Sequence, residues 1–70
     1  MILIVAATPG RAHRWARENK IGRRDYRVVT SAAGLLHVNK NLAQAIVIEP
    51  NKEVESELKW LRIPTKWLLY

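Results

Sequence analysis

The chain has 70 residues, of which 12 are basic and 6 acidic, so its formal net charge is +6. A chain of this length is expected to form a single domain over residues 1–70, with a thin core. It contains no cysteine, which excludes disulfides and thiolate chemistry and is typical of a reducing cytoplasm. No run approaches the roughly 20 apolar residues of a membrane-spanning helix, so no membrane partner is expected.

Apolar segments that lead through a turn into a helical pattern recur along the chain, which is the local signal of a parallel sheet. The pattern predicts strands at residues 2–7, 26–30, 44–48 and 65–70, and helices at about 11–20, 32–38 and 52–62. The first and third strands are apolar on both sides and are therefore expected in the middle of the sheet. With right-handed crossovers, we expect an α/β fold of βαβαβαβ order, an open parallel four-stranded sheet with strand order 2-1-3-4.

Turn and capping residues set the expected helix ends. Gly22 suits a left-handed conformation after the first helix. Ser31 and Asn51 are natural N-caps of the second and third helices. The second helix is expected to be short, and Gly34 weakens it.

Three helices are too few to cover both faces of such a sheet. The first helix is expected on one face and the other two on the opposite face, so the first face should lack a cover over the third and fourth strands. The last strand is also an unprotected edge, open to strand addition. We expect a homo-oligomer or docking on another protein, unless the tryptophans fold back and fill the gap. The apolar side chains expected at this interface are Trp60, Trp67, Leu69 and Tyr70.

The basic residues are concentrated between positions 11 and 27, where the net charge is +5. This charge favours anionic partners, although a solvated helix face explains it equally well. With Trp15 and Tyr26 nearby, the arginines would suit nucleic acid. The residues expected to bind an anion are Gly10, Arg11, Arg14, Arg17 and Ser31.

The crevice beyond the carboxyl ends of the first and third strands is the expected place for a nucleotide phosphate. The glycine motifs that cradle phosphates are absent, however, and Glu49 at this crevice would repel a phosphate. His13 and His37 lie on different predicted helices, with no carboxylate at a triad spacing. We expect no enzyme, no cofactor and no metal site.

Three segments, residues 2–8, 15–19 and 26–31, resemble small Rossmann-like proteins of unknown function from actinobacterial phages. That family often has a more strongly helical stretch where residues 33–35 lie here. The resemblance implies an accessory or host-takeover role in the cytoplasm of a bacterial host, and it carries no functional residue across. We therefore expect a non-enzymatic protein-binding module; the alternative is a basic protein that binds nucleic acid or nucleotide phosphate through its first helix.

Overall fold

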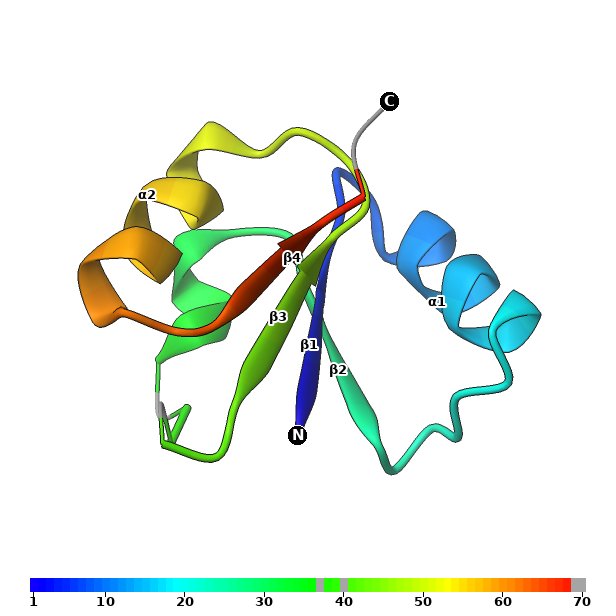
Figure 1. The fold of residues 1–70 in the computed structure, drawn as a ribbon. Helices are drawn as coiled ribbons and strands as arrows, with labels where there is room; N and C mark the ends of the chain where they lie inside the picture. Colours follow the sequence, from blue (N-terminus) through cyan, green and yellow to red (C-terminus); the bar gives the residue numbers. More distant parts are fainter. Residues whose placement is uncertain (37, 40, 69–70) are drawn as a thin grey trace.

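The chain alternates strands and helices along its whole described length (Figure 1). The computed structural model describes residues 1–36, 38–39 and 41–68. In chain order, its elements are β1 (Ile2–Val5), α1 (Pro9–Glu18), β2 (Tyr26–Val29), the 3-10 helix η1 (Ala32–Leu35), β3 (Gln44–Val47), α2 (Lys52–Leu61) and β4 (Thr65–Trp67). Among the described residues, no helix is long and apolar enough to cross a bilayer.

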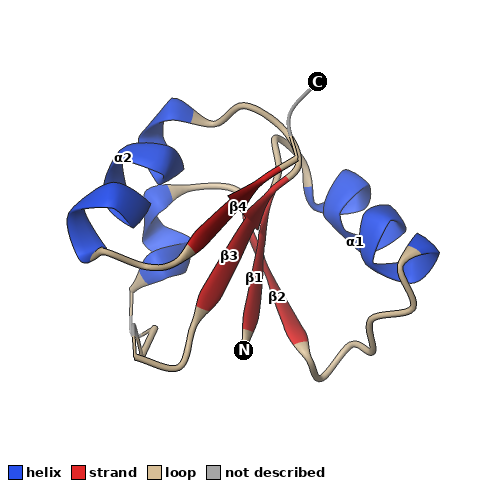
Figure 2. Cartoon of the chain, viewed as in Figure 1, coloured by secondary structure: helices blue, strands red, loops and turns tan. Residues whose placement is uncertain are grey.

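The four strands form one sheet, all parallel, in the order β2-β1-β3-β4 (Figure 2). In register, Ile4 of β1 lies between Val28 of β2 and Ile46 of β3. Ile4 is fully buried, as expected for a central apolar strand that is covered on both faces. The expected fold class and strand order are confirmed: the chain has a small α/β, Rossmann/flavodoxin-like fold.

Successive side chains of β1 pack into opposite layers, because strand residues alternate between the two faces of a sheet. Leu3 and Val5 lie in a core cluster with side chains of η1 and α2, whereas Ile4 and Ala6 lie in a second cluster with side chains of α1. We call these two sides of the sheet the α2 face and the α1 face. Figure 1 shows η1 and α2 together on one side of the sheet and α1 alone on the other.

Asn51 caps α2 and also ties together the carboxyl ends of two strands. Its side-chain oxygen accepts a hydrogen bond from the Val54 N–H at 3.3 Å, so the expected N-cap is confirmed. Its side-chain nitrogen donates to the carbonyl oxygen of Thr30 at 2.9 Å and to that of Ala6 at 3.4 Å. One side chain therefore satisfies backbone groups after β1, after β2 and in the first turn of α2.

The structure corrects the expected end of the first helix. Gly22 does not adopt a left-handed conformation; the residue with positive φ there is Lys20, at 56°. Helix α1 spans Pro9–Glu18, about two residues earlier than the pattern indicated. The left-handed turn comes directly after Asn19, whose side chain donates to the carbonyl oxygen of Trp15 at 2.8 Å.

The expected second helix is only the 3-10 turn η1, and Ser31 makes no side-chain capping bond to it. A close approach of the backbone explains why glycine stands in this turn. A Cβ built on Gly34 would lie 3.2 Å from Val29 Cγ1 and 3.5 Å from Val29 Cα. Strands β1, β2 and β3 each end one or two residues earlier than expected, and β4 ends at Trp67. Leu69, Tyr70 and His37 lie outside the described residues.

Candidate functional site

Among the described residues, no helix covers the α1 face over β3 and β4, as expected. Helix α1 packs on β1 and β2, while Ile48 and Leu68, beyond the ends of β3 and β4, are only half buried. Together with Trp15 and charged side chains of α1, these two residues line a hollow of about 520 Å³. The α1 face over β3 and β4 is therefore incompletely covered, and we call this region, which includes Ile48 and Leu68, the uncovered quarter of the sheet.

The expected interface residues do not form one patch on that uncovered quarter. Trp67 pairs in register with Val47, whose side chain belongs to the core on the α2 face, so Trp67 lies on the α2 face. Trp60 lies on α2 and is 82% exposed, and Trp67 is 52% exposed. The alternative in which both tryptophans fold back to seal the molecule is therefore wrong.

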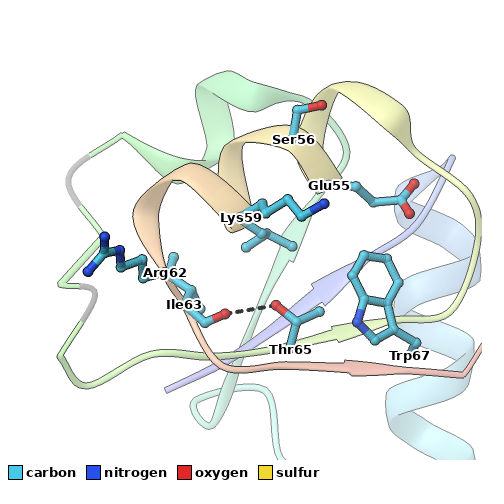
Figure 3. A pocket seen from close by; sticks show the side chains of 8 residues that line it. Glu55, Ser56, Lys59, Arg62, Ile63, Thr65 and Trp67 are labelled. Carbon is cyan, nitrogen blue, oxygen red and sulfur yellow. Dashed lines mark hydrogen bonds between the residues drawn. The ribbon is translucent and has the colours of Figure 1, made fainter.

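Trp67 instead lines a groove between α2 and the outer edge of the sheet (Figure 3). The groove has a volume of about 540 Å³. Glu55 and Lys59 project over it from α2, and the indole of Trp67 forms its wall on β4 (Figure 3). The full lining comprises Glu55, Ser56, Leu58, Lys59, Arg62, Ile63, Thr65 and Trp67.

The outer edge of β4 carries backbone groups that pair with no strand of the described chain. Ala45 donates to the carbonyl oxygen of Pro64 at 2.8 Å, and Leu68 donates to that of Val47 at 2.8 Å. In a parallel ladder these bonds alternate, so β4 uses residues 64, 66 and 68 toward β3. The N–H and C=O groups of Thr65 and Trp67 therefore point away from the sheet. This edge can accept one more strand.

Positive charge surrounds this edge on both faces of the sheet. Lys66 pairs in register with Ile46 and therefore projects from the α1 face. Lys59 and Arg62 line the groove on the α2 face. The acid in the groove, Glu55, is already engaged, because its Oε2 accepts a hydrogen bond from the Asn51 N–H at 2.7 Å. Of the charged side chains placed beside this edge, three are therefore basic and one is acidic.

The residues expected to bind an anion are not brought together. Arg11 Nε lies 3.8 Å from a carboxylate oxygen of Glu49, and Arg14 Nε lies 3.3 Å from one of Glu18. Arg17 lines a different hollow from Arg11 and Arg14. Gly10 has open space around it, and Ser31 lies at the start of η1, which packs on the α2 face. The arrangement argues against a single anion site made by these five residues.

Several backbone groups at the carboxyl ends of the strands are bonded by the chain's own side chains. Besides the bonds of Asn51, Glu49 Oε1 accepts a hydrogen bond from the Ala7 N–H at 3.1 Å. Glu53 Oε1 accepts one from the Ala32 N–H at 3.3 Å, at the start of η1. Glu49 and Glu53 therefore bring negative charge to this crevice, which argues against a phosphate there, although the first turn of α1 carries no side-chain cap.

His13 of α1 and Tyr26 of β2 contact each other, a pair that the sequence pattern did not indicate. His13 Nδ1 and the Tyr26 hydroxyl are 2.7 Å apart, and their rings meet edge to face at 5.7 Å between centroids. Arg23, which the sequence placed in a plain turn, lines the adjoining hollow. Within the part of the chain that the structure describes, no group of three or more histidine and acidic side chains could hold a metal ion.

No protein-family model, no curated protein and no solved structure matches this chain. The resemblance to phage accessory proteins stays a prediction.

Proposed function

We propose that this protein is a small binding module that takes an extended, acidic segment of another protein as a fifth strand beside β4. The observation that carries the proposal is the combination of an unpaired β4 edge with a groove that contains the half-exposed Trp67. Strand addition supplies main-chain hydrogen bonds, and side-chain pockets beside the edge supply specificity.

The added strand would place its side chains alternately on the two faces of the sheet. On the α2 face they would enter the groove and contact Trp67, with Lys59 near enough to pair with a carboxylate. On the α1 face the residue opposite Lys66 would be favoured if it were acidic, because opposite charges across two strands stabilise the pair. Lys59, Arg62 and Lys66, which lie beside this edge, would speed the encounter with such a partner.

The charge of Lys66 favours a different chain over a second copy at this edge. Two β4 strands related by a two-fold axis at this residue would set the two Lys66 side chains directly opposite each other, which is destabilising. Self-association through the uncovered quarter of the α1 face stays a prediction, and sedimentation at micromolar concentration tests it.

The proposal can be tested by selecting binders from a displayed library of random short peptides. We expect the enriched peptides to combine Asp or Glu with β-branched residues, because β-branched residues favour strands and the acids would meet Lys59 and Lys66. Replacing Trp67 by Ala should weaken their binding at least about tenfold, since it removes an aromatic anchor.

Trp60→Ala is the matched control, because it removes the same side chain from a position on α2 that does not line the groove, about 100° round the helix from Lys59. This variant should bind the selected peptides as the wild type does. The proposal fails if no peptide is enriched, if the enriched peptides are basic, or if both tryptophan variants bind equally well.

A further inference from the structure

Two adjoining hollows lie between α1 and β2, at the opposite edge of the sheet from β4. One has a volume of about 310 Å³ and the other about 140 Å³, and both are lined by His13, Arg23 and Tyr26. Val28 completes the first, and Arg17 and Ile21 complete the second. The combined space is in the range of small-ligand sites, which begins at about 300 Å³.

The lining of these hollows is basic and contains no carboxylate. Among the described residues, the salt bridges of α1 are made by Arg11 and Arg14, on its other flank, and neither Arg17 nor Arg23 takes part in one. An arginine that is not engaged in a salt bridge is a strong partner for phosphate, because its planar guanidinium donates two parallel hydrogen bonds.

The hollows also offer ring and apolar surfaces beside the arginines. Tyr26 is half buried on the edge strand, and its hydroxyl lies 2.7 Å from His13 Nδ1, which fixes the two rings relative to each other. Val28 and Ile21 add apolar walls. Any nucleobase can stack on such rings, because every base has a flat π-face. A bare inorganic anion would make no contact with these ring and apolar surfaces.

From this combination we infer that the hollows between α1 and β2 form a nucleotide site, in which Arg17 and Arg23 hold a phosphate and Tyr26 and His13 contact the base. The nucleotide has two sources with the same chemistry: a free mononucleotide, or one residue of a single strand. The site shares no residue with the groove at β4, so it stands independently of the proposed protein-binding function.

Calorimetric titration with inorganic phosphate, uridine, uridine monophosphate and short oligouridylate tests the inference. We expect uridine monophosphate to bind more tightly than either phosphate or uridine alone. A single strand as the source is indicated if the oligomer binds more tightly still and loses affinity with salt at about 0.7 log units per log unit for each further phosphate. Equal affinity of the oligomer and the mononucleotide indicates the free nucleotide.

Arg23→Gln and Arg24→Gln form a matched pair, because they remove the same charge from adjacent exposed residues and only Arg23 lines the hollows. Arg23→Gln should weaken uridine monophosphate about tenfold or more, as expected for a lost charge-assisted bond, and Arg24→Gln less than about twofold. Three results would overturn the site: no binding by uridine monophosphate or oligouridylate, phosphate binding as tightly as uridine monophosphate, or equal losses in the two variants.

Discussion

Val47 and Trp67 are register partners on the neighbouring strands β3 and β4, yet Val47 is fully buried and Trp67 is 52% exposed. The boundary of the core therefore runs between these two strands. On one side of it a side chain is fixed by packing, and on the other side a large aromatic ring faces an open groove.

Substitutions on the two sides of this boundary should affect stability very differently. We expect Val47→Ala to lower the free energy of unfolding by about 2 kcal/mol, since it removes two buried methyl groups and leaves a cavity. Trp67→Ala should lower it by less than about 1 kcal/mol, because much of the ring is already in water. Urea denaturation measures both, and an equal or larger loss for Trp67→Ala would place Trp67 in the core.

Asn51 should contribute to stability through its donor as well as its acceptor. We expect Asn51→Ala to lower the free energy of unfolding by about 2 kcal/mol, because the cap of α2 and the bonds to Ala6 and Thr30 are lost together. Asn51→Asp keeps a capping oxygen but sets a carboxylate against two carbonyl oxygens, so it should not restore wild-type stability. Wild-type stability of Asn51→Asp in the same urea titration would mean that the bonds to the strand ends contribute nothing.

Backbone conformation predicts opposite effects for glycine gained and glycine lost. Lys20 has a φ of 56°, where glycine is favoured, so Lys20→Gly should raise the free energy of unfolding by up to about 1 kcal/mol. Gly34→Ala should lower it by about 1–3 kcal/mol, because the new methyl group would press on Val29. Thermal unfolding of the two variants beside the wild type checks both signs.

Lys66 should act against pairing of two copies at the β4 edge. Lys66→Val removes the opposed charges and adds a β-branched residue, so we expect sedimentation velocity to show a larger dimer fraction than for the wild type at equal concentration. Lys52→Val, which removes an exposed charge at the start of α2 instead, serves as the control and should sediment as the wild type does. A dimer fraction that does not rise in Lys66→Val would show that this charge has no such role.

The topology could be predicted from local signals because apolar runs and turn residues mark each strand and helix. The N-cap at Asn51 follows from residue type and position in the same way. The left-handed residue after α1 could not be predicted, because Gly22 is the better intrinsic candidate and the chain nevertheless turns at Lys20. Likewise, Gly34 is explained only by the close approach of Val29, which depends on how η1 packs.

The contacts between site residues were harder to predict, because most of them connect residues on different helices and strands. The pair Arg14 and Glu18 is visible in the sequence as a helical spacing, but the approach of Arg11 to Glu49 depends on the pairing of β1 with β3. The same holds for His13 and Tyr26, which meet only because α1 packs beside β2. The face on which Trp67 lies follows from the register of β4, which no local pattern sets.

Amide hydrogen exchange at β4, with a library-selected peptide bound, is the sharpest test of strand addition. Exchange of the Thr65 and Trp67 amides should slow at least about tenfold, because both N–H groups point to the free edge and gain a partner. The Val28 amide, which points away from β1 at the opposite edge, should exchange at its original rate. Unchanged exchange at Thr65 and Trp67 under saturating peptide would mean that the peptide does not pair with β4.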